Sequence, residues 1–582
     1  MHVLTGWRGL RSSSLAAGVG VIFLLLAGLI LSLVGAPLLT VLISGFQSTV
    51  DKQPFEHRVL FTLENYRVIF STPRMLELAT NTFAFAIISI LISMSLATLF
   101  AWLVERTNMP GSNLAFTLII IPMIIPGMVT ALAWVLLLAP RTGILNEILR
   151  DIFSLGAEVG PLNIYTFWGM CFLQGIIQTP TVFLLLLPMF RSMDPSLEEA
   201  SRVSGANLMS TMRRVTLPLT YPAMTAALLY IFISAIESFD VPLIIGINAR
   251  VPVFTTQVYM YMYPPGGKLP NYGMASAFGT VVITIAILLM YLYTRSTRRA
   301  EEFVTITGKG YRPAPIDLGR WRYMAFAVVM VYVLIAIGLP FFILLWNSLV
   351  NFVQVPSIEA VSDFSLRWYK AAFMGASKAI SNTVILTVMS PTIATLIAAV
   401  ASWFIVRSRM PGRRILDMVT FLPHSIPGII FGMAFMFLGL TVLLGPIYGT
   451  IWILVLALTA KSLAFPTRVM VAANLQIHKE LEEMALMCGS SWGRTLRHIN
   501  LPLITPAAFS GWILVALLAA KELTICLMLF SPSNVVIATR IWNYWEIGAV
   551  SETCALSVML IAFVAALFLV ARPIILKRAS TH

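Results

Sequence analysis

Apolar segments long enough to cross a lipid bilayer recur along the whole chain, and they constrain its fold more than any other feature. A membrane-spanning helix needs about 20 consecutive, mostly apolar residues. The sequence therefore predicts an all-α integral membrane protein with about 12 transmembrane helices. The segments lie at about residues 15–46, 80–104, 113–139, 165–190, 219–246, 274–294, 323–349, 380–406, 415–444, 449–475, 502–530 and 551–571.

The composition excludes other classes of protein. Of the 582 residues, 58% are hydrophobic and only 11% are charged, whereas a soluble globular protein carries about 25% charged residues. So few polar side chains could not cover a soluble multidomain enzyme, and the same composition excludes a disordered chain. The four cysteines lie far apart and form no disulfide or zinc pattern. The first apolar segment is too long for a signal peptide and is expected to remain as the first span.

Lysine and arginine residues are distributed unevenly between the two sets of loops. One set, which includes both termini, holds 24 of the 39, and the opposite set holds 12. Because cytoplasmic loops carry the excess of positive charge, both termini are predicted to be cytoplasmic. The net charge of +14 is assigned to these loops. Nucleic-acid binding is not expected, since no arginine-rich stretch with interleaved aromatic residues occurs.

The two halves of the sequence repeat one another. Asn81 returns as Asn382 and Pro126 returns as Pro427, both at an offset of 301 residues, whereas later matches have an offset of 284. The second half has therefore lost 17 residues between its third and fourth spans. Six spans in each half give the copies the same orientation, related by an axis along the membrane normal. The predicted units are a first half at 1–300, a cytoplasmic linker at 301–322 and a second half at 323–582.

The segments 197–223 and 481–507 match best, with 11 of 27 positions identical. Each is predicted to form a helix, a glycine turn and a second helix, because acidic residues suit a first helical turn and glycine tolerates the left-handed conformation that ends helices. Glu199 precedes Gly205 by six residues, and Glu483 precedes Gly489 by the same spacing. One copy could be a solvated connector, but two copies in the same membrane context argue for a function.

The spacing Glu-Ala-Ala, three residues, Gly, nine residues, Ile-x-Leu-Pro resembles the cytoplasmic signature of ABC importer permeases that are served by a periplasmic binding protein. This sequence departs from it mildly at Ser201, Val215 and Met484. The resemblance implies two fused halves of the type I ABC importer permease fold. It also implies coupling segments at 195–218 and 479–502 that dock on the two subunits of a cytoplasmic ATPase homodimer. The docking residues it assigns are Glu198, Glu199, Ala200, Gly205, Glu482, Glu483, Ala485 and Gly489.

Within that family, the fused chain resembles the iron(III)-type permeases and the related thiamine, polyamine and phosphonate systems of the bacterial inner membrane. The expected function is the transport subunit of an ATP-driven importer, for iron(III) or for another of these solutes. The chain has no G-x4-G-K-[ST] phosphate loop, so ATP and Mg²⁺ are expected on the partner ATPase, and no cofactor or metal on this chain. The alternatives are an ion-coupled secondary transporter, which would have no ATPase to dock, and a membrane enzyme, for which no catalytic motif is present.

Ionisable side chains inside spans are costly and are therefore candidates for function. Glu237 and Asp240 lie in the fifth span, and Lys521 and Glu522 lie at nearly matching positions in the eleventh. These four residues either line the translocation path or a gate, or they only fix helix packing or lie near the periplasmic interface. A Glu237–Lys521 ion pair across the pseudo-symmetry axis is one hypothesis.

Three further residues inside spans are candidates for the path or gate. Pro126 and Pro427 lie in the third and ninth spans, where proline removes a helix hydrogen bond and permits a kink. The kinks either gate the path or only serve packing. His424 lies inside the ninth span, and it is either a packing residue or a ligand of the substrate.

Overall fold

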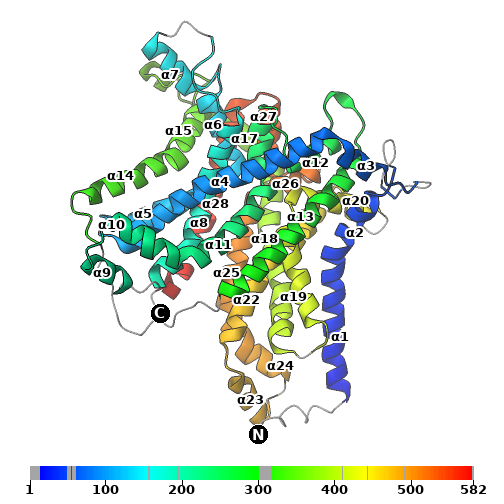
Figure 1. Cartoon of the computed structure of the whole chain (residues 1–582). Helices are drawn as coiled ribbons and strands as arrows, with labels where there is room; N and C mark the ends of the chain where they lie inside the picture. The colour runs from blue at the N-terminus through cyan, green and yellow to red at the C-terminus, as the bar shows by residue number, and fades with distance from the viewer. Residues whose placement is uncertain are drawn as a thin grey trace.

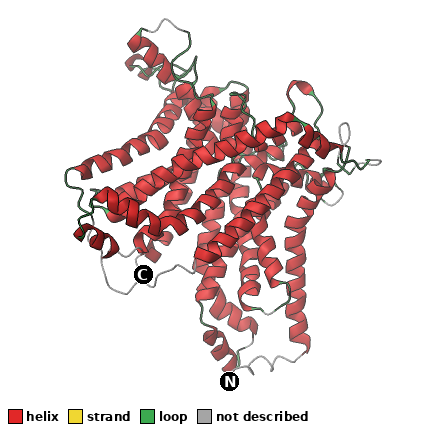
Figure 2. Cartoon of the chain, viewed as in Figure 1, coloured by secondary structure: helices red, strands yellow, loops and turns green. Residues whose placement is uncertain are grey.

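The computed structural model describes residues 13–48, 54–55, 60–154, 158–192, 196–300, 316–408, 410–441, 444–490 and 492–579. Within these residues the regular structure is helical, apart from two isolated β-bridges, Gln47–Phe61 and Thr107–Ile316 (Figure 2). The prediction of an all-α membrane protein is confirmed. Most of the predicted linker, residues 301–315, lies outside the described residues.

Among its described residues, the first half contains thirteen α-helices and several short 3₁₀ or π-helical turns (Figure 1). In chain order the elements are α1 (Ser13–Ile30), η1 (Leu31–Gly35), α2 (Ala36–Ser44), α3 (Glu64–Ser71), α4 (Pro73–Arg106), α5 (Ser112–Ile120), η2 (Ile121–Ile124), α6 (Gly127–Leu138), α7 (Ile144–Phe153), α8 (Phe167–Ser192), α9 (Ser196–Val203), α10 (Leu208–Thr211), η3 (Met212–Thr216), α11 (Leu217–Glu237), η4 (Pro242–Gly246), α12 (Phe254–Met262), η5 (Pro265–Gly267) and α13 (Tyr272–Ala300).

The second half follows the same plan. Its elements are α14 (Trp321–Val333), η7 (Leu334–Gly338), α15 (Leu339–Leu349), α16 (Ile358–Val361), α17 (Arg367–Gly375), α18 (Ser377–Arg407), α19 (Arg413–Phe421), η8 (Leu422–Ser425), α20 (Gly428–Gly439), η9 (Gly445–Ile447), α21 (Ile451–Ser462), α22 (Ala464–Gln476), α23 (Lys479–Met487), α24 (Trp492–Thr495), η10 (Leu496–Asn500), α25 (Leu501–Ala520), α26 (Thr524–Met528), α27 (Ile537–Glu546) and α28 (Val550–Ala579).

Each of the twelve predicted spans coincides with a helix or a pair of helices in the described residues. Eight are helices long and apolar enough to cross a membrane. Three are bent pairs: Ser112–Ile124 with Gly127–Leu138 at 95°, Arg413–Ser425 with Gly428–Gly439 at 110°, and Ile451–Ser462 with Ala464–Gln476 at 44°. The fifth, α11, carries a shorter apolar stretch at Ala227–Glu237.

Helix directions show that the two sharply bent pairs are crossings and not re-entrant loops. Arg191 near the end of α8 pairs with Glu105 near the end of α4, with 2.8 Å between Nε and Oε1. The two helices therefore run in the same direction, so the α5–α6 pair between them returns the chain across the membrane. In the second half, Arg407 at the end of α18 donates to the carbonyl of Asn474 near the end of α22, and the α19–α20 pair returns the chain in the same way.

The first span of each half packs on the other half. Phe23 in α1 contacts Phe404 in α18, with ring centroids 5.3 Å apart. Tyr332 in α14 contacts Phe100 in α4, with centroids 4.9 Å apart. In Figure 1, α1 and α14 accordingly lie at opposite edges of the molecule. This exchange interlocks the halves, because neither can move away without separating from its partner's first helix.

The repeat extends to irregular details of the backbone. The π-helical turn η3, just before α11, is matched by η10 just before α25, and the 3₁₀ turn η2 is matched by η8. Helix α7 has only the short turn η9 as its counterpart. It therefore occupies the place where the sequence comparison puts the 17 residues that the second half lacks.

Candidate functional site

The two coupling segments, α9–α10 and α23–α24, form the predicted helix–turn–helix structures. Gly205 follows α9 with φ of +86°, and Gly489 follows α23 with φ of +79°. Both glycines thus have the left-handed conformation that ends a helix and that residues with a Cβ rarely adopt. Both segments lie on the lower side of the molecule in Figure 1, and α7 and α12 lie on the upper side.

A buried ion pair fixes the first coupling segment to the end of the second span. Arg106 donates to Glu198 at 2.5 Å, and the two side chains are only 3% and 5% exposed. Thr216, in the turn that leads into α11, donates to the other carboxylate oxygen of Glu198 at 2.7 Å. Glu198 thus connects α9 to α4 and to the start of the fifth span. In the structure its carboxylate faces this chain and not the surface that a partner would contact.

The second coupling segment has the equivalent connection. Arg407 at the end of α18 lies 3.1 Å from Glu482, measured between Nε and Oε1, and Asn500 donates to the same oxygen at 2.8 Å. Arg407 also donates to the carbonyls of Asn474 and Ile477. Glu482 is 20% exposed, so this contact is less buried than the first. The sequence interpretation overlooked the arginines, although Arg106 and Arg407 have the repeat offset of 301 residues.

Both coupling segments carry exposed apolar side chains. Val203 in the first is 89% exposed, and Met487 in the second is also 89% exposed. Met209 and Met484 are exposed beside them. Of the other predicted docking residues, Glu483 and Ala200 are exposed and Glu199 and Ala485 are partly exposed. A contiguous exposed apolar surface outside the membrane commonly marks an interface with another protein, and each coupling segment contributes two exposed apolar side chains.

Pro126 and Pro427 interrupt the third and ninth spans completely, which is more than the predicted kink. A proline disfavours helical conformation in the residue before it, and Ile125 and Ile426 are accordingly extended, with ψ of 128° and 127°. The helix ends in a 3₁₀ turn and restarts at Gly127 or Gly428. Carbonyl groups at such a break have no helical partner, and in a membrane they need one.

A lysine ammonium satisfies the carbonyls at each break. Lys521 donates to the carbonyl of Met123 at 2.7 Å, and it reaches from the second half to the break in the first. Lys461, from α21, donates to the carbonyls of Pro423 and Ile426 at the second break. A cation also complements the negative end of the helix dipole there. Lys461 is one of two cations within the tenth apolar segment, with Arg468, and that signal could have identified it from the sequence.

The hypothesis of a Glu237–Lys521 ion pair is wrong. Glu237 pairs with Lys461, with 3.4 Å between Oε2 and Nζ, because Lys521 extends toward Met123 instead. Asp240 accepts a hydrogen bond from the backbone N–H of Met128, at the start of α6, at 3.2 Å.

Glu522 accepts in the same way from the N–H of Ile525 at 3.0 Å, at the start of α26. Asp240, Lys521 and Glu522 therefore complete the ends of broken helices. Their assignment to a translocation path stays a prediction.

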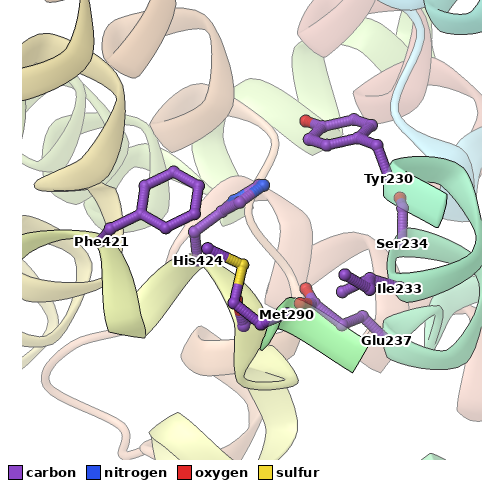
Figure 3. Close-up of a pocket in the computed structure, with 8 residues that line it drawn as sticks. Tyr230, Ile233, Ser234, Glu237, Met290, Phe421 and His424 are labelled. Atoms are coloured by element: carbon purple, nitrogen blue, oxygen red, sulfur yellow. The ribbon is translucent and has the colours of Figure 1, made fainter. Parts of the chain in front are cut away.

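Glu237 and His424 face a small cavity between the two halves. The cavity has a volume of about 30 Å³ and is lined by Tyr230, Ile233, Ser234, Glu237, Met290, Phe421, His424 and Ser425. In Figure 3 the four lining residues of α11 lie opposite Phe421 and His424 of the second half. The His424 ring stacks on Tyr230, with centroids 5.4 Å apart and planes inclined by 25°. The sequence interpretation overlooked Tyr230, which is ordinary in an apolar helix.

Named relatives of this chain are transport permeases. The ferric transport system permease protein of Actinobacillus pleuropneumoniae is 26% identical over 458 residues, which cover 77% of this chain and 64% of the relative. A putative ferric transport system permease protein of Haemophilus influenzae is 27% identical, over 67% of this chain and 60% of the relative. The chain thus spans less than two thirds of these two proteins. A third relative, an Fe(3+)-transport system permease protein of H. influenzae, is 22% identical over 84% of this chain and 88% of its own length.

The model of one protein family matches the chain twice. The matched residues are 97–302 and 392–575, and the family is described as the binding-protein-dependent transport system inner membrane component. Each match contains one coupling segment and the broken span of its half, which confirms the internal repeat. This chain therefore belongs to the family of binding-protein-dependent transport system inner membrane components, as a multi-pass protein with two copies of the family's domain in one polypeptide.

Proposed function

We propose that this chain is the membrane-spanning subunit of an ATP-driven importer, and that it forms the path for a solute delivered by a periplasmic substrate-binding protein. The observation that carries the proposal is the pair of coupling segments. Each is fixed to the transmembrane helices by a glutamate, and each has an exposed apolar side chain on its outward side. That combination suits a lever on which another protein acts.

The partner at the coupling segments is an ATPase homodimer, with one subunit on α9–α10 and one on α23–α24. Two pseudo-equivalent segments in one chain suit two identical subunits. Closure of the dimer would move the segments toward each other, and the contacts of Glu198 and Glu482 would transmit the motion to α4 and α18. ATP and Mg²⁺ belong to the partner, because this sequence has no phosphate-binding loop. The chain is thus a transport subunit and not an enzyme.

The proposed cargo is iron(III), on the basis of the three relatives named for ferric transport. Thiamine, a polyamine or a phosphonate is the alternative cargo. The excess of lysine and arginine in those loops supports a cytoplasmic location for the coupling segments and both termini. The long loop around Gly266 then faces the periplasm, where the binding protein would dock.

Reconstitution tests the coupling. The purified chain in nanodiscs is expected to hydrolyse no ATP, and to form a complex of one permease and two ATPase subunits when the partner ATPase is added. Val203→Glu and Met487→Glu, which place a charge on each apolar surface, should each weaken co-purification of the ATPase. Robust ATP turnover by the chain alone would overturn the proposal.

A matched control separates docking from general damage. Ile358 in α16 is 93% exposed, and it follows the first span of the second half on the opposite side of the membrane. Ile358→Glu should leave co-purification of the ATPase unchanged. Uptake of radioactive ferric iron, thiamine and spermidine by cells that express the complete system then identifies the cargo. Import of thiamine or spermidine without iron would replace iron(III) in the proposal.

A further inference from the structure

The cavity between the two halves contains polar atoms that have no partner in the protein. Oε1 of Glu237 and Oγ of Ser425 are buried and make no hydrogen bond among the described residues. Ser425 is fully buried, and both residues line the cavity. A buried oxygen without a partner costs free energy unless a ligand or water completes it. A water molecule, or a ligand that donates to or coordinates oxygen, would complete both atoms.

The charges around the cavity do not balance. The cluster contains the carboxylates of Glu237, Asp240 and Glu522 and the ammonium groups of Lys461 and Lys521. Each of these groups interacts electrostatically with at least one other member of the cluster. At their ordinary charges the cluster has a net charge of −1. An uncompensated negative charge inside a membrane protein is costly, and either a proton on one carboxylate or a bound cation would compensate it.

The ammonium of Lys461 does not occupy the free side of Glu237. It lies 3.4 Å from Oε2 and is held in place by the carbonyls of Pro423 and Ile426. Oε1 is left for a ligand. On the other side of the cavity, His424 is oriented by the ring of Tyr230, and an imidazole nitrogen is a common metal ligand.

The cavity has room for a single ion. Its volume of about 30 Å³ is enough for one ion or one water molecule. We therefore propose that the cavity is a transit site, in which the Glu237 carboxylate, the His424 imidazole and the Ser425 hydroxyl hold one metal cation of the cargo between the two halves.

The transit site rests on the proposed function, and it makes that function more specific. A site on a transport path must bind strongly enough to admit the ion and weakly enough to release it. Two of its ligands, His424 and Ser425, adjoin the break of the ninth span, and the third, Glu237, ends α11, the helix that follows the first coupling segment. Separation of the halves would thus pull the ligands apart and release the ion.

The test measures iron on the purified full-length chain in nanodiscs. Radioactive iron(III), supplied as its citrate chelate, should be retained at about one ion per wild-type chain. Glu237→Gln and His424→Ala should each weaken retention roughly tenfold or more, as expected when a group at a metal site is replaced. Glu64→Gln, in the exposed helix α3, is the control and should retain iron like the wild type. Size-exclusion profiles and melting temperatures show whether each variant is folded.

The outcomes separate the transit site from the importer function. If cells with the wild-type system import iron but the purified chain retains none, or if folded Glu237→Gln and His424→Ala chains retain as much as the wild type, the transit site is refuted and the importer remains. The cluster would then be neutralised by a proton. If such cells import a different solute and no iron, the cargo assignment fails independently of the binding result.

Discussion

Replacement of Glu198 by glutamine should release the first coupling segment from the transmembrane helices. Glu198 and Arg106 are almost completely buried, and Glu198 also accepts from Thr216. The amide would keep a weak hydrogen bond but would leave the arginine charge without a counter-charge. Removal of one partner from a buried ion pair costs about 3–5 kcal/mol. At about 1.4 kcal/mol for each factor of ten, the detached state should become roughly 100 to 4,000 times more populated.

Hydrogen–deuterium exchange of the chain in nanodiscs measures this change. Amides of α9, α10 and η3 should exchange faster in Glu198→Gln, whereas those of α18 should not change. Glu64→Gln removes one partner of an ion pair whose side chains are 80% and 61% exposed, and it should change exchange very little. Glu482→Gln should have a smaller effect than Glu198→Gln, because Glu482 is partly exposed and Arg407 retains two carbonyl acceptors.

A double variant tests the physical reason. Replacement of a buried ion pair by apolar side chains of similar size is often neutral, so Arg106→Met combined with Glu198→Met should exchange more slowly than Glu198→Gln alone. Unchanged exchange of α9 and α10 in Glu198→Gln would refute the idea that this pair holds the segment. If the double variant keeps slow exchange but loses iron uptake, the charged pair has a role in transport beyond stability.

Three further predictions concern the turns, the helix breaks and the topology. Gly205→Val and Gly489→Val should insert into the membrane normally but lower iron uptake sharply. There is space for the added Cβ, with no atom within 4 Å, but a β-branched residue is strained at positive φ. Full uptake by the double variant would contradict this. Lys521→Met should lower the melting temperature of the purified chain, because the carbonyl of Met123 loses its donor at a cost of about 1–3 kcal/mol, and an unchanged melting temperature would show that this contact is dispensable. A cysteine at Gly266 should react with a membrane-impermeant reagent from the periplasmic side only, and labelling from the cytoplasm would reverse the predicted orientation.

The functional segments were partly predictable because their signals are local. The spacing of Glu199 to Gly205, repeated at Glu483 and Gly489, predicted two helices that end at glycine, and both turns have that geometry. The inward orientation of Glu198 could not be predicted. Glu199 is the next residue on the same helix and carries the same charge, so the sequence does not distinguish the two. Only the position of α4 beside α9 decides which of the two is buried.

The ionisable groups in the membrane show the limit of reasoning from aligned positions. Glu237 and Lys521 correspond in the repeat and carry opposite charges, which suggested a pair across the axis. The breaks at Pro126 and Pro427 changed the outcome, because each exposes carbonyl groups that compete for the lysines. The prolines were visible in the sequence, but the size of the bend, 95° and 110°, depends on how the restarted helices pack.

The sequence by itself determined the membrane class, the twelve apolar segments, the repeat and the two glycine turns. These are properties of composition and of spacing along one chain, so they require no knowledge of neighbours. The tertiary structure alone decided that α1 packs on the second half and α14 on the first, and that the lysines serve the broken helices. The physical reason is that lipid and helix neighbours are equally apolar. A spanning helix is hydrophobic on all sides, and its sequence does not indicate which side faces another helix.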